Sequence, residues 1–269
     1  LAKGGDAELL RGWVFDWRRG FADAAASRAG LAPGESFLLS RNAWLGTAHH
    51  GAALWSGDVD SSFDELSLQV RAGQQAGLSG IPLWTTDIGG YAGGDPDEPG
   101  FQQLIVRWFQ FGAFCPLFRL HGHRAGGPPA DECGPTNGDN EGGSLAREPA
   151  HCAAIASVMR RRERLRPYVH ALHNESVATG VPMMRAMALE FAADAACARD
   201  EAEAQFMLGP EWLVSPVTRE NATEWPVYLP ALSDGRQWLY WWNQSVVAGG
   251  GWRSVDVRAI GDFPLFHMI

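Results

Sequence analysis

The feature that most restricts the fold of this chain is a regular alternation of strand-like and helix-like segments in its first half. Short apolar stretches alternate with longer amphipathic stretches, in which apolar residues recur at helical spacing. In order, they predict a strand at 37–39, a helix at 62–76, a strand at 80–84, a helix at 99–111 and a strand at 116–120. Strands separated by helices in this way pair in parallel, so the pattern predicts a parallel sheet with crossover helices.

Two of the predicted helices have additional local support. Ser62 followed by Glu65 is a capping box, which satisfies free backbone N–H groups at the start of the helix at 62–76. An earlier helix is predicted at 7–21, where Leu10, Trp13, Val14 and Trp17 fall at helical spacing.

Charged and polar residues follow directly after the predicted strands. Arg41 follows the strand at 37–39, Asp87 follows the strand at 80–84, and Arg119 and His121 lie at the end of the strand at 116–120. In parallel barrels the active site forms at the C-terminal ends of the strands. We therefore predict an α/β fold in which residues 1–180 form the C-terminal part of a (β/α)8 TIM barrel.

The pattern changes after Val181, where short β-type runs are separated by turn residues. The runs cover residues 182–189, 205–217, 225–230, 237–242, 255–258 and 263–269. They predict a small antiparallel β-sandwich domain over residues 181–269. Just before it, residues 148–168 predict one basic helix, whose arginines near the C-terminal end complement the helix dipole. These arginines are Arg160, Arg161, Arg162, Arg164 and Arg166.

The composition narrows the range of partners. A formal net charge of −9 argues against nucleic acid or an anionic membrane surface as a partner. No apolar run approaches the roughly 20 residues that span a bilayer. The cysteines show no CxxC spacing, so we expect no metal site and no cofactor. The cysteines are either free thiols or, in an exported protein, include a Cys133–Cys152 disulfide. Glycosylation sequons at Asn174, Asn221 and Asn243 weakly favour a secretory route.

Asp58 is the first candidate for chemistry. It follows Trp55 and Gly57 and lies just ahead of the capped helix. An apolar wall such as Trp55 raises the pKa of a nearby carboxyl, which is what a general acid requires. A loop aspartate that caps or turns the chain would show the same pattern, so the residues alone leave both interpretations open.

Asp87 is the second candidate, at the end of an apolar strand. Gly89 and Gly90 follow it and would let the backbone approach a ligand closely, with Tyr91 at the border. An Asx-turn is the structural alternative, but the strand-end position and the neighbouring aromatic residues favour a functional role.

Arg119 and His121 flank Leu120 and therefore lie on the same face of a strand. Together they can bind hydroxyl groups or orient a carboxylate. The structural alternative is an arginine in an ion pair and a neutral histidine that accepts a hydrogen bond. The residues by themselves do not choose between the two.

Most other aromatic residues and motifs favour structural roles. Helical spacing predicts core positions for Trp108, Phe109, Phe111 and Phe114. Trp238, Trp241 and Trp242 fit packing at the edge of the β domain better than a binding platform. No G-x-S-x-G elbow, H-E-x-x-H motif or Gly-rich phosphate loop is present.

Taken in order, these motifs resemble glycoside hydrolase family 31. Ser40-Arg41 and then Trp55-Ser56-Gly57-Asp58 resemble the acid/base region of that family. Further similarities, which together cover nearly the whole chain, are at residues 78–82, 84–91, 107–110, 118–121, 165–168, 182–185 and 206–210.

The resemblance implies a retaining exo-α-glycosidase of the α-glucosidase and α-xylosidase type, acting on oligosaccharides or α-glycosides. In such enzymes one aspartate is the nucleophile and a second carboxyl is the acid/base. By matching position, Asp58 is the acid/base and Arg41 is the arginine beside it. The remaining substrate-binding positions are Asp87 and His121 as ligands of sugar hydroxyls, Trp84 and Tyr91 as pocket walls, and Trp55 and Arg119 as supporting residues.

The resemblance also places the nucleophile of the family on an earlier barrel strand, upstream of Leu1. Asp16 lies in the predicted helix at 7–21 and does not fit that role. We therefore expect a fragment that has one of the two catalytic carboxylates and is inactive by itself. The alternative is a non-catalytic remnant that binds carbohydrate or a partner, and a lyase or transglycosylase is a third possibility.

Overall fold

A computed structural model describes residues 24, 26–32, 37–43, 48, 51–123, 148–233 and 235–269. The predicted helix at 7–21 and Asp16 lie outside these residues. Cys115 and Cys197 are buried free thiols. Cys152 is disulfide-bonded, and its predicted partner Cys133 lies outside the described residues.

The first part of the structure is built on parallel strands, as predicted. Strands β1 (Leu38–Ser40), β2 (Ala52–Trp55) and β3 (Trp84–Thr85) form a three-stranded parallel sheet in chain order. Helix α2 (Phe63–Leu78) connects β2 to β3, and α3 (Pro99–Gly112) follows β3. The predicted cap of α2 is present, because Ser62 Oγ accepts a hydrogen bond from the Glu65 N–H at 3.1 Å.

Two predicted strands differ from the structure in extent. The strand expected at 80–84 is reduced to Trp84–Thr85, and Pro82 has no N–H to donate to a ladder. The segment 116–120 forms an isolated bridge between Leu120 and Ile88 rather than a strand. The Ile88 N–H donates to the Arg119 carbonyl at 3.3 Å, so this segment still lies beside the β3 end of the sheet.

The single helix predicted over 148–168 is two helices, α4 (Pro149–Arg164) and α5 (Arg166–Thr179), which meet at Leu165. Pro167 lies in the first turn of α5, where its missing N–H is tolerated, whereas within one continuous helix it would remove a backbone hydrogen bond. The prediction overlooked this proline as a helix start.

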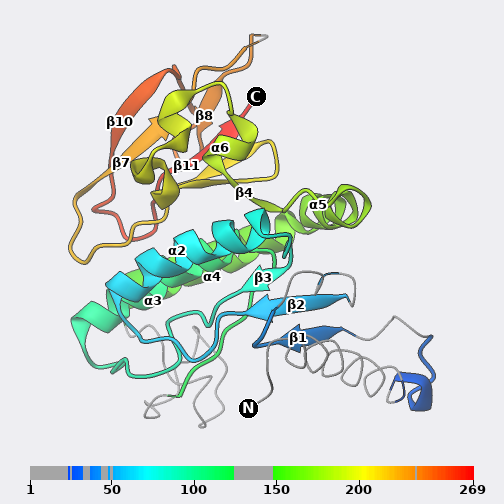
Figure 1. The fold of residues 1–269 in the computed structure, drawn as a ribbon. Coiled ribbons are helices and arrows are strands. Elements are labelled where there is room, and N and C mark those ends of the chain that lie inside the picture. Colours follow the sequence, from blue (N-terminus) through cyan, green and yellow to red (C-terminus); the bar gives the residue numbers. More distant parts are fainter. Residues whose placement is uncertain are drawn as a thin grey trace, which may run out of the picture.

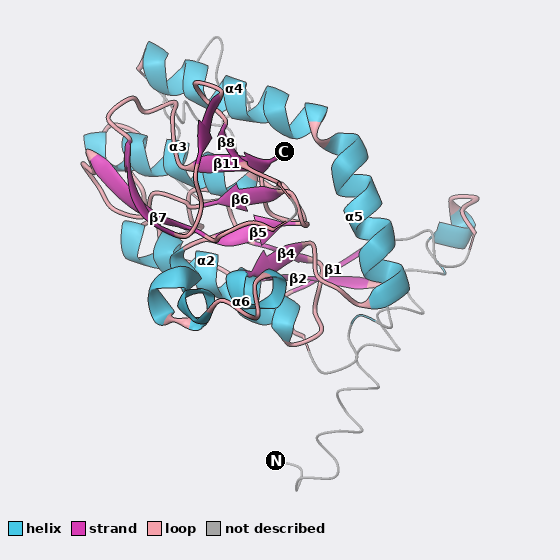
Figure 2. Cartoon of the chain, turned by 90° about the horizontal axis from the view of Figure 1, so that it is seen from above, coloured by secondary structure: helices cyan, strands magenta, loops and turns pink. Residues whose placement is uncertain are grey.

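The second part of the chain is antiparallel throughout. A six-stranded sheet has the order β4-β5-β6-β11-β8-β9, and β7 pairs separately with β10; Figure 2 shows most of these strands side by side. The predicted sandwich packing stays a prediction. Strand β9 was not predicted, nor were the short helices, and residues 187–190 are helical rather than extended. The elements are β4 (Met184–Ala186), α6 (Met187–Glu190), η2 (Ala195–Ala198), η3 (Asp200–Ala204), β5 (Phe206–Leu208), β6 (Trp212–Val214), β7 (Glu224–Leu229), β8 (Trp238–Tyr240), β9 (Ser245–Val247), β10 (Gly251–Asp256) and β11 (Leu265–Met268).

Helices α2, α3 and α4 lie between the parallel strands and the antiparallel part (Figure 1). The predicted core residues Trp108, Phe109, Phe111 and Phe114 are all buried. The rings of Phe111 and Phe206 are 6.0 Å apart, so α3 packs directly against β5. This hydrophobic contact makes one continuous core from the two parts.

The tryptophans of the second part serve packing, as predicted. Trp238 is fully buried, and its indole N–H donates to the Pro230 carbonyl at 2.9 Å. The ring of Trp241 lies 4.9 Å from that of Trp212 and beneath the Arg161 guanidinium at 4.4 Å.

The contact between α2 and β4 depends on two glycines of α2, Gly73 and Gly77, which have no side chain. A Cβ at Gly73 would lie 2.8 Å from Met184 Sδ, and one at Gly77 would lie 2.9 Å from Pro182 Cβ. Both glycines are on the buried face of α2. They allow the strand to approach the helix more closely than any larger residue would permit.

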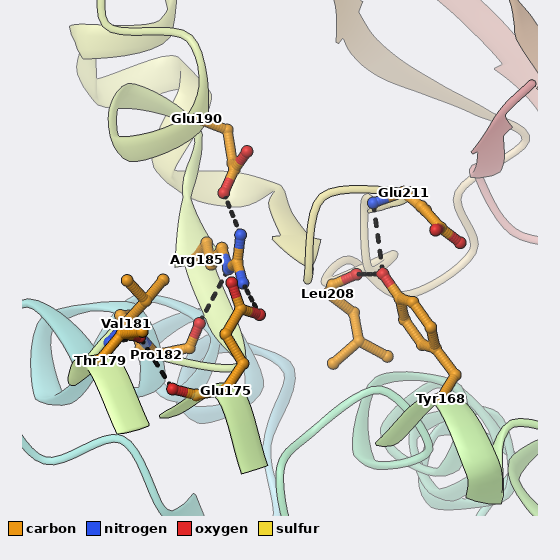
Figure 3. A network of polar contacts seen from close by, with 9 residues as sticks. All are labelled: Tyr168, Glu175, Thr179, Val181, Pro182, Arg185, Glu190, Leu208 and Glu211. Carbon is orange, nitrogen blue, oxygen red and sulfur yellow. Dashed lines mark hydrogen bonds and ion pairs between the residues drawn. The ribbon is translucent and has the colours of Figure 1, made fainter. Parts of the chain in front are cut away.

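A buried arginine joins α5 to the start of the antiparallel part (Figure 3). Arg185 is 4% exposed and donates to the Pro182 carbonyl at 2.9 Å, to Glu175 of α5 at 2.6 Å and to Glu190 of α6. A second link in the same view is the Tyr168 hydroxyl, which donates to the Leu208 carbonyl at 3.0 Å. Every nitrogen of the Arg185 guanidinium therefore has a partner.

Two more arginines hold backbone carbonyls, Arg107 across the same junction and Arg162 within the first part of the chain. Arg107 of α3 donates to the carbonyls of Val257 and Asp262 at 2.8 and 2.7 Å. Arg162 of α4 donates to the carbonyls of Ala113, Cys115 and Pro116 at 3.0, 2.7 and 2.8 Å. Arg162 thus caps the C-terminal end of α3, a role more specific than the dipole effect that was predicted.

Candidate active site

The predicted site residues lie just beyond the ends of the parallel strands. Arg41 directly follows β1, and Asp58 lies three residues after β2. Arg41 Nη1 and Asp58 Oδ2 form an ion pair at 3.2 Å, in which the side chains are 56% and 35% exposed. Asp58 is therefore a carboxyl that a bound molecule can reach, and the Arg41 guanidinium holds it in place.

Asp87 and Arg119 form a second ion pair with a different environment. The Asp87 side chain is fully buried, whereas that of Arg119 is 28% exposed. Burial raises the pKa of the Asp87 carboxyl above its ordinary value, because a low dielectric disfavours the charged form. The charges of Arg119 and His121 act in the opposite direction and lower this pKa.

Trp55 lies at the centre of these groups. The guanidinium carbons of Arg41 and Arg119 lie 5.4 and 5.2 Å from its ring centroid, within the range of cation–π attraction. His121 meets the ring edge-on, with the centroids 6.2 Å apart. The ring of Tyr91 also lies beside that of His121, with the centroids 5.2 Å apart. One indole ring therefore connects the Arg41–Asp58 pair to the Asp87–Arg119 pair.

Two buried polar atoms of the site have no hydrogen-bond partner among the described residues. They are Oδ2 of Asp87, an acceptor, and Nε1 of Trp55, a donor. The indole N–H faces the carboxylate and helps to lower the pKa of Asp87, but the two atoms do not reach hydrogen-bond geometry. Five further buried polar atoms of the described residues also lack a partner, in Gln69, Trp108, His151, Arg161 and Ser176. Asp87 and Trp55 are the two that lie in the strand-end group, where a polar ligand would complete their hydrogen bonds.

Backbone contacts between distant segments hold the site loops together. The Tyr91 N–H donates to the Val59 carbonyl at 2.7 Å, and the His123 N–H donates to the Tyr91 carbonyl at 2.8 Å. Ala92 forms parallel bridges with both Asp60 and His123. The loops after β2 and β3 and the segment after α3 therefore continue the parallel pairing beyond the sheet.

Trp84 is the one predicted site residue that the structure does not bring to this group. It is 2% exposed, its ring lies 6.3 Å from that of Phe111, and it packs against Gly73 of α2. Its side chain belongs to the core between the sheet and the helices, because successive strand residues face opposite sides.

The glycines after Asp87 also differ from the prediction. A Cβ at Gly90 would lie 2.7 Å from the backbone of Asp60 and Ser61. The close approach that this glycine permits is therefore to the neighbouring loop of the chain, rather than to a ligand as expected.

Sequence reasoning missed a hydrogen bond that joins β2 to β3 beneath the site. Ser56 Oγ donates to Thr86 Oγ1 at 3.2 Å, and the Ser56 N–H donates to the Thr85 carbonyl at 3.2 Å. Both hydroxyl residues directly precede predicted site segments, but no sequence pattern pairs two hydroxyls across strands.

Within the described residues, no three His, Cys, Asp or Glu side chains gather as metal ligands would. No helix in the described part of the chain has the length and hydropathy needed to cross a membrane.

Comparison with known proteins identifies the family. Residues 12–172 match the TIM-barrel domain of glycosyl hydrolases family 31, and residues 180–268 match the C-terminal domain of the same family. The chain therefore belongs to glycosyl hydrolase family 31, as its motifs predicted.

Proteins similar to this chain carry several different enzyme names. Alpha-xylosidase A of Aspergillus niger is 31% identical over 97% of this chain and 37% of its own length. A probable glucan 1,3-alpha-glucosidase of Oryza sativa is 32% identical over 83% of this chain and 22% of its own length. The crystal structure of a GH31 alpha-xylosidase from a soil metagenome, complexed with xylose, superimposes with a TM-score of 0.77 and 37% identity, over 93% of this chain and 37% of that one. The chain thus spans well under half the length of these relatives.

Proposed function

We propose that this chain provides the acid/base and sugar-binding side of a retaining, exo-acting α-glycosidase with α-glucosidase-like activity. Asp58 is the acid/base. The terminal sugar is held by Arg41, Asp87 and His121, with Trp55 and Tyr91 along its border and Arg119 fixing Asp87. The second carboxylate, the nucleophile, comes from a part of the full-length protein outside this sequence.

The observation that carries the proposal is the unpaired acceptor and donor at Asp87 Oδ2 and Trp55 Nε1. A sugar hydroxyl both donates and accepts hydrogen bonds, so one hydroxyl can satisfy both atoms. The surrounding rings of Trp55, Tyr91 and His121 supply apolar surface of the kind that binds the carbon faces of a sugar ring. Asp58 lies next to Arg41 at the accessible side of this group.

The proposed reaction uses Asp58 twice. Asp58 first protonates the leaving glycosidic oxygen while the nucleophile forms a covalent glycosyl-enzyme. The resulting carboxylate then takes a proton from water as the water attacks the intermediate. Arg41 Nη1 donates a hydrogen bond to Asp58 Oδ2 at 3.2 Å and so positions this carboxyl for both steps. In retaining enzymes the two carboxyl groups are about 5–5.5 Å apart, which sets the distance expected to the missing nucleophile.

The test is Asp58→Asn in the full-length protein. General acid/base catalysis contributes about 10²–10⁴-fold, so we expect a fall of that order in kcat for maltose and a smaller fall for an aryl α-glucoside, whose leaving group needs less protonation. Asp60→Asn, an exposed aspartate two residues further on, is the matched control and keeps wild-type rates. Near-native turnover of both substrates by Asp58→Asn contradicts the assignment.

The relatives support α-xylosidase activity as a second candidate. Two of the similar proteins described above are named as xylosidases. Xylose differs from glucose only in lacking the exocyclic hydroxymethyl group, so the same acid/base and the same buried carboxylate serve both. The ratio of kcat/KM for an aryl α-xyloside to that for an aryl α-glucoside, measured on the full-length protein, decides between them.

A further inference from the structure

We propose that Gly57 is a positioning residue of this site, because the space that a side chain at position 57 would need is occupied by the guanidinium of Arg41. Gly57 thereby determines where Arg41 meets Asp58. This inference rests on the proposed function, since it assigns a consequence for Asp58 as the acid/base.

A side chain at position 57 would meet one neighbouring residue first, Arg41. A Cβ built on Gly57 would lie 3.0 Å from Nε, 3.3 Å from Nη2 and 3.4 Å from Cζ of Arg41. Its three nearest atoms all belong to this one guanidinium. Contacts this short are closer than van der Waals packing normally allows, so a methyl group at position 57 requires one of the two residues to move.

Arg41 is the partner that moves. Its side chain is 56% exposed and ends in a flexible stem, so it can swing toward solvent at little cost. Gly57 is buried, and the preceding residue, Ser56, is held to Thr85 and Thr86 by two hydrogen bonds of 3.2 Å. The backbone is therefore the fixed side of the contact.

A displaced Arg41 loses its contact with the acid/base. The Arg41–Asp58 distance is 3.2 Å, at the long end for a hydrogen bond between charged groups. A shift of a few tenths of an ångström takes this distance beyond hydrogen-bond range. The cation–π contact with Trp55, at 5.4 Å, is disturbed by the same movement.

Gly80 provides a matched control for the backbone conformation. Both glycines have a positive φ, +89° at Gly57 and +78° at Gly80. A Cβ at Gly80 would meet no atom within 4 Å, in contrast to one at Gly57. Alanine in the left-handed region costs about 1–2 kcal/mol at either position. Only the substitution at Gly57 adds the contact with Arg41.

The experiment compares Gly57→Ala, Gly80→Ala, Arg41→Ala and the double variant Gly57→Ala/Arg41→Ala in the full-length protein. We expect similar decreases in Tm for the two glycine variants. Gly57→Ala alone lowers kcat/KM for maltose by about 10- to 100-fold, the size of effect that a small misplacement of a catalytic group produces. In the Arg41→Ala background, adding Gly57→Ala changes kcat/KM by less than about twofold, because no guanidinium remains to be displaced.

Three outcomes overturn the inference. One is a Gly57→Ala protein as active as Gly80→Ala. The second is an equal loss from Gly57→Ala with and without Arg41, which assigns the effect to the backbone. The third is failure of both Gly57→Ala and its double variant to fold while Gly80→Ala folds. If only the single variant fails to fold and the double variant folds, the contact with Arg41 is supported. Near-native turnover by Asp58→Asn would reject the proposed function separately, whatever the glycine variants show.

Discussion

The strand-end site and the junction between the two parts of the chain use arginines in opposite ways. At the junction, Arg185 donates to two carboxylates and a backbone carbonyl, and Arg107 donates to two backbone carbonyls and a side-chain amide oxygen. At the site, Arg41 and Arg119 each pair with one carboxylate and lie over the same indole ring. Every nitrogen of the Arg185 guanidinium has a partner, whereas the site keeps an acceptor and a donor unpaired.

This difference separates residues that stabilise the fold from residues that are available to a ligand. A buried polar group without a partner costs about 1–3 kcal/mol, and at the site a ligand can supply the missing hydrogen bonds. Saturated arginines, in contrast, fix the helices against the sheets. We therefore expect substitutions at the site to reduce activity much more than stability, and substitutions at the junction to do the reverse.

The largest expected effect is that of Asp87→Asn on activity. Asparagine keeps the shape and a contact with Arg119 but removes the charge that accepts hydrogen bonds from sugar hydroxyls. Two hydrogen bonds to a charged group, each contributing about 1.5–3 kcal/mol, imply a fall in kcat/KM of about 10²–10⁴-fold. The measurement is steady-state kinetics on the full-length protein, with exposed Asp97→Asn from the same loop as the control. A loss of stability that matches the loss of activity would break the comparison.

The next largest effect is that of Arg185→Ala on stability. The substitution leaves Glu175, Glu190 and the Pro182 carbonyl without their shared partner, and removing one partner of a buried pair costs about 3 kcal/mol. Arg166→Ala is the control, because the Arg166–Glu163 pair is 63% exposed on both sides and such pairs contribute about 0–1 kcal/mol. Urea unfolding of both variants measures the difference. Equal midpoints would show that the junction does not depend on its buried arginine.

The smallest effect is a pH dependence that comes from Asp87. Burial raises its folded-state pKa above the ordinary value of 3.8, so the folded protein holds this proton more tightly than the unfolded chain. The wild type therefore loses stability as pH rises from 3.8 to the folded pKa, and the loss is complete above it. Asp87→Asn lacks this loss, so its stability relative to wild type should rise as the pH increases from 3.8 to the folded-state pKa. Thermal melts of both proteins across this interval test the sign, and the opposite trend would mean that Arg119 and His121 outweigh burial.

Local sequence patterns predicted a large part of the fold. The alternation of apolar strands with amphipathic helices predicted the parallel sheet, and the Ser62 capping box located the start of α2 to the residue. Strand-end positions predicted where Arg41, Asp58, Asp87, Arg119 and His121 would lie. These predictions succeed because strand and helix periodicity depend on neighbours in sequence, and because parallel strands end at a common edge.

The predictions that failed depended on orientation or on distant contacts. Trp84 is predicted to be a pocket wall. Its side chain instead faces the core, because Gly73 of α2 leaves room for its ring. The segment 116–120 has apolar residues like those of a strand, but it forms one isolated bridge, from Leu120 to Ile88. Single hydrogen bonds join Leu117 to Trp84 and to Thr85 of β3.

The sequence by itself determined the kinds of elements, their order and the residues at the strand ends, since these follow from local periodicity and from motifs. Only the tertiary structure decided which of those residues meet. The capping of α3 by Arg162 and the room for Arg41 beside Gly57 are contacts between segments far apart in the chain. Their geometry depends on how the sheets and helices pack, and packing is set by the whole core rather than by any single segment.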